Sequence, residues 1–177
     1  MMEFDNFIGR QKMFLSEKEC ETVIDAMYDK KLHYEFVTGH DEWRSDTCVF
    51  LDPDTDLFKT LNTKLFESLK PYRKKYHLPH IDRYKNTDIK IQVSEDNGGF
   101  HSWHYEWGGD YSDREIVWMV YLNDDFEGGH TEFKHLDHSE KPETGKLLFF
   151  PAGYTHYHRA SPELKGQKYI ITGWLTR

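Results

Sequence analysis

The sequence GGFHSWHYE at residues 98–106 begins a series of short apolar segments and turns that continues to Arg177. Hydrophobic residues recur here with the two-residue period of a half-buried strand, as in Ile89, Ile91 and Val93. Strands are expected at residues 89–93, 100–107, 115–122, 131–133, 146–150, 154–158 and 168–175. At least seven short strands after two helices predict a mainly β protein with a jelly-roll, or double-stranded β-helix, core.

The opening segment carries a histidine and a glutamate two residues apart. Residues i and i+2 of an extended strand point to the same face, so His104 and Glu106 present an imidazole and a carboxylate side by side. A second histidine from a later strand would complete three ligands. Two histidines and one carboxylate, with the other coordination positions open, are typical of non-haem Fe(II) enzymes. We therefore expect residues 100–107 to form a metal-binding strand.

The second histidine is expected in the segment HYH, where His156 and His158 lie two residues apart on one predicted strand. Strand periodicity alone does not separate the two. A rival pair, His101 and His104, has a spacing that does not share a strand face. The simplest interpretation makes surface or turn residues of four histidines, His101, His130, His135 and His138.

The order of these segments resembles the 2-oxoglutarate/Fe(II) oxygenases, specifically their prolyl 4-hydroxylase branch. Gly-Gly precedes the His-x-acid pair, and VYLN at 120–123, FEGGHTEF at 126–133 and GKLLFFP at 145–151 follow in the family's order. The family then has a proline four residues after the distal histidine and a lysine or arginine ten residues after it. Counted from His158, these are Pro162 and Lys168, and Trp174 fits six residues further on. The resemblance covers about the second half of the chain.

This resemblance assigns roles to individual residues. It implies that His104, Glu106 and His158 are the catalytic metal ligands, and that Lys168 pairs with the distal carboxylate of 2-oxoglutarate. Two further residues, Tyr121 and Thr131, match positions that line the co-substrate pocket, although each fits an ordinary core position equally well.

The chain departs from the family pattern at two positions. Glu106 stands where the family usually has aspartate, and Glu95 stands where many prolyl hydroxylases carry a pocket tyrosine. Glu106 keeps a charged oxygen donor, which argues against a halogenase, where a halide needs the carboxylate's coordination site. Glu95 weakens the expectation of a prolyl substrate.

The activity implied by the resemblance is hydroxylation of a C–H bond, coupled to decarboxylation of 2-oxoglutarate to succinate. Fe(II), 2-oxoglutarate and O2 would be required, with ascorbate in a supporting role. A prolyl residue in a peptide or protein is the family's expected substrate, with a small molecule as the alternative. The loop-like segments 44–47 and 107–114 are expected to form the rim of the substrate site. Four aromatic residues would supply its surface: Trp103, Tyr105, Trp107 and Tyr111.

Two other classes of function stay open on the sequence. The first is a cupin-type metal enzyme that binds its metal through His101, His104 and His158 and does not use 2-oxoglutarate. The second is a catalytically silent module that binds a ligand on the same fold. The complete ligand set and Lys168 argue against the silent module.

The composition limits the partners and the location of the chain. The net charge is −8 and no basic block is present, which argues against a dedicated nucleic-acid binder. Cys20 and Cys48 do not make a disulfide framework. The N-terminal residues lack the pattern of a signal peptide, and no apolar run reaches membrane-spanning length. We expect a soluble cytoplasmic protein that does not bind membranes, while its oligomeric state is open.

Residues 1–86 are expected to support a jelly-roll core at 87–177, within a single domain spanning 1–177. Residues 1–14 resemble an opening strand, and 47–51 a short one. Ser16 and Glu19 predict a capping box that starts a helix of about 14 residues. Leucines every four residues predict a second helix from Asp54, with a break at Pro71. Both helices are expected to buttress one face of the sheet.

Overall fold

The computed structural model describes residues 1–41, 43–78 and 83–177. The first half of the chain contains β1 (Met2–Asp5), β2 (Ile8–Gln11), α1 (Glu17–Ala26), β3 (His33–His40), β4 (Arg44–Leu51), α2 (Asp56–Tyr76) and β5 (Lys85–Asn86). The second half contains β6 (Lys90–Ser94), β7 (Gly99–Phe100), β8 (Arg114–Tyr121), β9 (Glu127–Gly128), β10 (Thr131–Phe133), β11 (His138–Glu140), β12 (Leu147–Pro151), β13 (His158–Ala160), β14 (Leu164–Lys165) and β15 (Lys168–Thr176). Two short 3-10 turns, η2 (Lys134–Leu136) and η3 (Tyr154–His156), complete the described elements.

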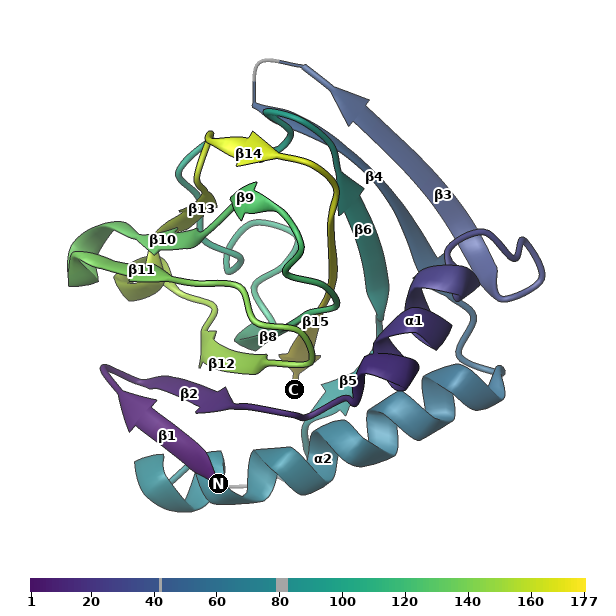
Figure 1. Cartoon of the computed structure of the whole chain (residues 1–177). Helices are drawn as coiled ribbons and strands as arrows, with labels where there is room; N and C mark the ends of the chain where they lie inside the picture. The colour runs from purple at the N-terminus through teal and green to yellow at the C-terminus, as the bar shows by residue number, and fades with distance from the viewer. Residues whose placement is uncertain (42, 79–82) are drawn as a thin grey trace.

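The strands form one large and two small antiparallel sheets. The large sheet has the order β1-β2-β12-β8-β15-β6-β4-β3, with β5 beside β15 and β7 beside β4. The small sheets are β11-β10-β13 and β14-β9. Figure 1 shows the small sheets on one side of the large sheet and the two helices on the other. The expected fold class, a mainly β jelly-roll with N-terminal buttressing helices, is confirmed.

Strand β8 separates two hydrophobic cores. Its residues Ile116, Trp118 and Val120 join the core that contains α1 and α2. The alternate residues of β8 face the interior of the jelly-roll, where they pack with Phe133 and Phe150. The prediction that this strand is buried on both faces is therefore confirmed, because a helix layer covers one face and the small sheets cover the other.

Both predicted helices are present with different lengths. Ser16 caps α1 and forms the predicted capping box with Glu19, but the helix has 10 residues rather than about 14. The side chain of Thr55 caps α2, which continues through Pro71 to Tyr76. The predicted break at Pro71 is wrong, because buried residues on both sides of it, Leu69 and Tyr72, hold α2 against the sheet.

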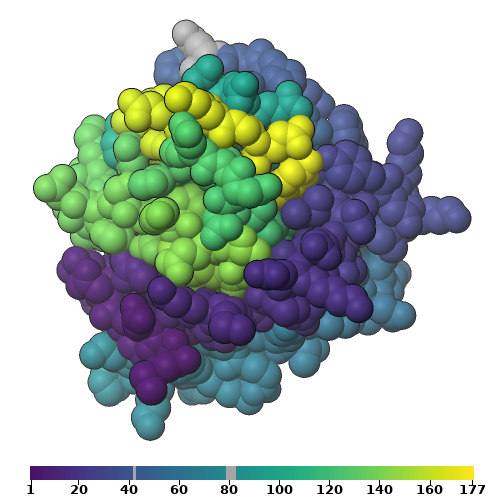
Figure 2. Space-filling model, viewed as in Figure 1, coloured from purple at the N-terminus to yellow at the C-terminus, as the bar shows by residue number. Residues whose placement is uncertain are grey.

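The first 86 residues contribute strands to the same sheet as the later residues. The predicted opening strand is two strands, β1 and β2, and β2 pairs with β12 across residues 147–149. Figure 2 shows this N-terminal segment, in purple, lying against the green C-terminal half. The predicted strand at 47–51 begins earlier, at Arg44, and pairs with β3, which the sequence did not indicate. β3 is an edge strand with alternating intermediate and exposed residues, so it lacks a clear hydrophobic pattern.

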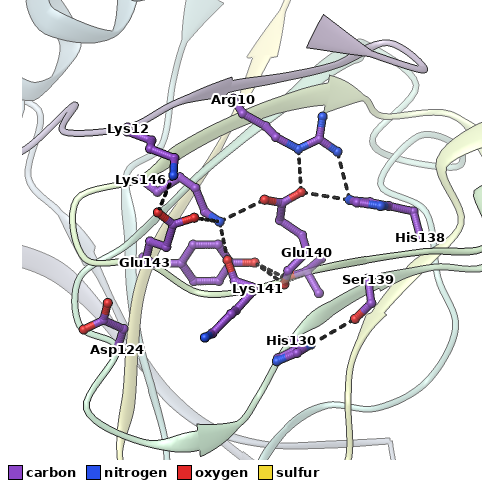
Figure 3. A network of polar contacts seen from close by, with 12 residues as sticks. Arg10, Lys12, Asp124, His130, His138, Ser139, Glu140, Lys141, Glu143 and Lys146 are labelled. Carbon is purple, nitrogen blue, oxygen red and sulfur yellow. Dashed lines mark hydrogen bonds and ion pairs between the residues drawn. The ribbon is translucent and has the colours of Figure 1, made fainter. Parts of the chain in front are cut away.

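A network of charges fastens the N-terminal hairpin to the jelly-roll (Figure 3). Arg10 Nε of β2 donates to Glu140 Oε2 of β11 at 2.6 Å, and Lys146 Nζ donates to Glu140 Oε1 at 2.9 Å. His138 Nε2 lies 2.9 Å from the same carboxylate. Burial alone would raise the pKa of Glu140, but hydrogen bonds from His138, Lys146 and Arg10 hold it below its usual value. The carboxylate is therefore charged, and it contacts side chains from β2, from β11 and from Lys146 just before β12.

No helix among residues 1–41, 43–78 and 83–177 is long and apolar enough to cross a membrane.

Candidate metal centre and co-substrate cavity

A pair of side chains two residues apart, His104 and Glu106, meets the distant His158 inside the jelly-roll. His104 Nε2 lies 3.5 Å from Glu106 Oε1, and His158 Nε2 lies 4.0 Å from the same oxygen. One ligand atom from each residue lies within 4.8 Å of the others. These are the three metal ligands that the sequence resemblance implies.

Backbone pairing brings the two histidines together. The amide of His104 donates to the carbonyl of His158 at 3.0 Å, and the amide of His158 donates back at 2.8 Å. The predicted strand at 100–107 is nevertheless wrong in extent, since β7 ends at Phe100 and His104 lies in an isolated bridge. The local pairing suffices to keep His104 and Glu106 on one side.

The predicted strand at 154–158 is also wrong, and this separates the two competing histidines. Residues 154–156 form the 3-10 turn η3, and β13 begins only at His158. His156 therefore does not share a strand face with His158, and its Nε2 hydrogen-bonds to the carbonyl of Asn6 at 2.9 Å. His158 is the one beside His104 and Glu106.

The hydrogen bonds of both histidine rings leave Nε2 free. His104 Nδ1 lies 2.8 Å from the carbonyl of Ser102, and His158 Nδ1 lies 2.8 Å from the carbonyl of His156. A carbonyl oxygen only accepts, so each Nδ1 carries the proton and each Nε2 presents a lone pair. Metal-binding histidines are oriented by backbone carbonyls in the same way.

The charge state of the cluster suits a divalent metal ion. Burial and the neighbouring His104 lower the pKa of His158 to about 4, so this imidazole is neutral at pH 7. Burial acts to raise the pKa of Glu106, but the neighbouring His104 and His158 and the positive charge of Lys90 lower it to about 2. Two imidazole lone pairs and a carboxylate thus face one another, an arrangement that a cation between them stabilises. The residues fit Fe(II), which binds such a set with open positions.

Arg114 is a further residue of the site, which the sequence marked only as the end of a loop. Its Nη1 donates to Glu106 Oε2 at 3.1 Å, while Glu106 Oε1 faces the histidines. The guanidinium lies between two aromatic rings, 3.8 Å from the centroid of Tyr111 and 3.7 Å from that of Trp174. Arg114 thereby fixes the orientation of the carboxylate.

The three clustered residues line a cavity of about 640 Å³ between the large sheet and β13. Lys168, at the start of β15, lines the same cavity and is only 5% exposed. Burial lowers its pKa to about 8, and its ammonium group donates to the carbonyl of Gly129. Gly129 has φ +61°, and a Cβ there would come within 3.2 Å of Lys168 Cδ. Gly129, between β9 and β10, therefore leaves room for the lysine.

Two residues with an expected co-substrate role lie beside Lys168. The Tyr121 ring centroid is 5.5 Å from Lys168 Nζ, and the Tyr121 hydroxyl donates to Thr131 Oγ1 at 2.7 Å. Thr131 lines the cavity, whereas Tyr121 is fully buried behind it. An ammonium, a hydroxyl and a phenol thus meet at one end of the cavity.

Only some of the residues expected at the rim of the substrate site line the cavity. Tyr105, Trp107 and Tyr111 line the cavity and are 42% to 55% exposed, whereas Trp103 stacks with Arg159 instead. The predicted loop at 44–47 is wrong, because these residues begin strand β4. Glu95 is exposed, and its carboxylate accepts a hydrogen bond from Gln167.

His101 does not join the cluster. Its Nε2 lies 2.8 Å from the carbonyl of Asn97, and its Nδ1 lies 3.3 Å from the carbonyl of Ala160. Both ring nitrogens thus face acceptors. This arrangement disfavours the cupin-type set of His101, His104 and His158.

Comparison with curated proteins finds prolyl hydroxylases. The chain is 32% identical to prolyl 3-hydroxylase 2 of Rattus norvegicus over 71 residues, which cover 37% of this chain and 10% of that protein. It is 26% identical to prolyl 4-hydroxylase subunit alpha-1 of Gallus gallus over 153 residues, which cover 70% of this chain and 29% of that protein. The chain thus spans less than a third of the length of these relatives.

Comparison with solved structures finds the same fold. The viral collagen prolyl hydroxylase of Paramecium Bursaria Chlorella virus-1, in its complex with 2OG, has a TM-score of 0.76 over 96% of both chains, at 22% identity. Residues 69–176 match the sequence pattern of a family described as the 2OG-Fe(II) oxygenase superfamily. The match includes the three clustered residues and Lys168 and covers more than half of the chain. This protein therefore belongs to the 2OG-Fe(II) oxygenase superfamily.

Proposed function

We propose that the protein is a 2-oxoglutarate- and Fe(II)-dependent hydroxylase in which His104, Glu106 and His158 hold the iron. One observation carries the proposal: two Nε2 lone pairs and one carboxylate oxygen converge in a cavity that also contains a buried lysine. The lysine supplies an ammonium group for the distal carboxylate of a dicarboxylate co-substrate. The cluster supplies three ligands for a metal and leaves its other coordination positions open.

The residues around the metal ligands have defined tasks in this proposal. When bound, Fe(II) would supply the oxygen chemistry that inserts hydroxyl into a C–H bond while 2-oxoglutarate is converted to succinate and CO2. The carbonyls of Ser102 and His156 orient the two imidazoles. Arg114 turns one oxygen of Glu106 toward the histidines.

Lys168 would bind the distal carboxylate of 2-oxoglutarate, and Thr131 would donate its hydroxyl to the same group. A buried ammonium group is costly without an anion, so the arrangement favours a carboxylate there. The Tyr121 hydroxyl donates to Thr131 Oγ1, so Thr131 keeps its own proton. That proton faces only a weak acceptor, Met119 Sδ at 3.8 Å, and a carboxylate of the co-substrate would be a stronger one.

A prolyl residue in a peptide is the substrate that the relatives support, since those named above are prolyl hydroxylases. The cavity has an exposed aromatic edge made by Tyr105, Trp107 and Tyr111, which suits a pyrrolidine ring and an extended peptide. Ascorbate is proposed as a supporting reductant that keeps the metal ferrous.

The decisive experiment measures succinate formation with Fe(II), 2-oxoglutarate, ascorbate and proline-containing peptides, with mass spectrometry of the peptides. Hydroxylated peptide and stoichiometric succinate are expected. Anaerobic addition of Fe(II) and 2-oxoglutarate should also produce a visible charge-transfer band, which His104→Ala and His158→Ala should abolish. His135→Ala is the matched control, because His135 is exposed and outside the cluster.

Other outcomes would favour other functions. A band without turnover on any peptide would indicate a silent binding module or another substrate. No dependence on 2-oxoglutarate, together with metal-dependent turnover, would contradict the proposal.

A further inference from the structure

Two lysines lie at opposite ends of the cavity. On β15 the residues Lys168 and Thr172 pair with Ser94 and Lys90 of β6, respectively. Lys90 therefore lies four strand positions from Lys168, which is roughly 13 Å at the rise of a β-strand. Both lysines line the cavity. If Lys168 binds the co-substrate, Lys90 is at the other end, where the exposed aromatic residues lie.

The other cations of the cavity wall have partners. Arg44 pairs with Asp46, Arg114 with Glu106 at 3.1 Å, and Arg159 with Glu132 at 2.7 Å. The backbone of Lys90 pairs within the sheet, but its ammonium has no hydrogen bond or ion pair to any residue within 1–41, 43–78 and 83–177. Asp88, two residues before Lys90, instead accepts from the hydroxyls of Tyr34 and Thr87.

Lys90 is half-buried in the cavity wall, beside a buried aromatic ring. Its ammonium lies 5.1 Å from the centroid of the Trp174 ring, which is 5% exposed. Burial lowers the pKa of Lys90, although nearby acidic groups, Glu106 first, oppose the shift. The stacking of Arg114 on Trp174 adds a second cation to this end of the cavity.

Trp174 contributes an independent observation. Its indole Nε1 is buried and has no hydrogen-bond acceptor in the described part of the chain. Buried donors are nearly always paired, so this one indicates a missing acceptor. Trp174 lines the cavity, and a ligand in the cavity can supply that acceptor.

We propose that Lys90 and Trp174 form a subsite for a carboxylate of the substrate, so that the enzyme hydroxylates an anionic substrate. This inference rests on the proposed function, because it assigns the opposite end of the cavity to 2-oxoglutarate. A neutral peptide carbonyl would satisfy the indole N–H but would leave the Lys90 charge uncompensated. A carboxylate satisfies both groups, and charge-assisted hydrogen bonds are the stronger kind.

Two sources of this carboxylate share the same chemistry. One is the free C-terminus of a chain that ends at the target residue, and the other is an acidic side chain next to it. Four probes separate the sources: Ac-Ala-Pro-NH2, Ac-Ala-Pro-OH, Ac-Pro-Asn-NH2 and Ac-Pro-Asp-NH2. Their binding is measured by anaerobic calorimetry against the protein loaded with Fe(II) and 2-oxoglutarate, so that no turnover is needed.

At least one carboxylate probe should bind roughly 10-fold or more tightly than its neutral counterpart, as expected for hydrogen bonds to a charged group. Lys90→Met should remove this difference while leaving the affinity for the neutral probe and for 2-oxoglutarate unchanged. Lys90→Arg should retain part of the preference, and Trp174→Phe should reduce it because the indole N–H is lost. Lys85→Met is the matched control, since Lys85 is exposed on β5 and outside the cavity wall.

Two results would overturn the inference. In the first, carboxylate probes bind no better than neutral ones, whether both bind or neither does. In the second, Lys90→Met weakens 2-oxoglutarate binding, which would assign Lys90 to the co-substrate. These two results can be distinguished from a failure of the proposed function. In that case, Fe(II) and 2-oxoglutarate would not bind to the wild-type protein.

Discussion

At the scale of single residues, the carboxylate of Glu106 is shared between two sets of partners. Glutamate has one methylene more than the aspartate usual in the family, so its oxygens have more freedom to rotate. Arg114 restricts this freedom by donating to Oε2 at 3.1 Å while Tyr111 and Trp174 hold the guanidinium between their rings. The extra side-chain length is thus compensated by an additional contact.

Arg114→Gln should weaken Fe(II) binding by about 10- to 100-fold, because residues that orient metal ligands typically contribute that much affinity. Anaerobic Fe(II) titration in the absence of 2-oxoglutarate measures this directly. Arg159→Gln is the control, since Arg159 also lines the cavity but pairs with Glu132. Equal Fe(II) affinity in both variants would remove Arg114 from the support of the metal site.

Lys168 should make 2-oxoglutarate binding dependent on pH. Burial lowers the pKa of Lys168 to about 8, so its ammonium is charged at pH 7 and loses its proton as the pH rises past 8. Affinity should therefore be constant below that pH and fall by up to about tenfold per unit above it, by linkage. Calorimetric titration of 2-oxoglutarate across this range measures the effect.

Two variants test the assignment of that pH dependence. Lys168→Arg should bind more weakly but with a flat profile, because a guanidinium stays protonated. Lys168→Ala should bind roughly 100-fold more weakly at neutral pH, as expected when a buried charge loses its partner. A wild-type profile that is flat past pH 8 would show that Lys168 does not bind the co-substrate.

At the scale of secondary-structure elements, α2 shows how burial overrides a local signal. Proline in a helix interior lacks the N–H that would bond to the carbonyl four residues earlier. Pro71 nevertheless lies inside α2, between the buried residues Leu69 and Tyr72. Pro71 is exposed, so its ring contributes little packing.

Pro71→Ala should therefore stabilise the protein by about 1–3 kcal/mol, the gain being limited by the greater freedom of the unfolded chain. The urea midpoint of unfolding should rise, with the slope of the transition unchanged. Lys70→Ala, at the neighbouring exposed position, should change the free energy of unfolding by less than about 0.5 kcal/mol. A lower midpoint for Pro71→Ala would show that α2 needs the proline for a local bend.

At the scale of the whole molecule, the N-terminal hairpin and the jelly-roll share a sheet and a charge network. β2 pairs with β12, and Arg10 reaches across to Glu140 on β11. We propose that the support at 1–86 and the core at 87–177 unfold together as one domain. Circular dichroism and tryptophan fluorescence should then report the same urea transition.

Glu140→Gln should destabilise this assembly by about 3–5 kcal/mol, because it leaves Arg10 and Lys146 without their buried anion. The matched control is Glu127→Gln, whose partner Lys165 is 80% exposed, and it should cost less than about 1 kcal/mol. Urea unfolding at neutral pH measures both. Equal losses in the two variants would contradict a structural role for the buried network.

The effect of Glu140→Gln should also depend on pH in a defined direction. The folded-state pKa of Glu140 lies below its usual value of 4.5, so the carboxylate stabilises the fold above that value. This stabilisation is lost as the pH falls through the folded-state pKa. The difference between wild type and variant should accordingly shrink on acidification.

The sequence alone determined the fold class and most of the candidate metal site. Strand periodicity, turn glycines and the capping box at Ser16 act within a few residues, so they predicted the β-rich fold, both helices and the His104–Glu106 pair. The fixed offsets to Pro162 and Lys168 selected His158 as the resemblance implied. These signals could be found because each depends on short-range geometry.

Only the tertiary structure decided the rest, because it depends on contacts between residues far apart in the chain. The edge strand β3 is held by pairing with β4 rather than by a hydrophobic pattern. A 3-10 turn directs His156 toward Asn6 instead of toward the metal cluster. Arg114 and Lys90 are ordinary charged residues in the sequence. They became parts of the cavity wall when β8 brought Arg114 to Glu106 and β6 brought Lys90 to Trp174.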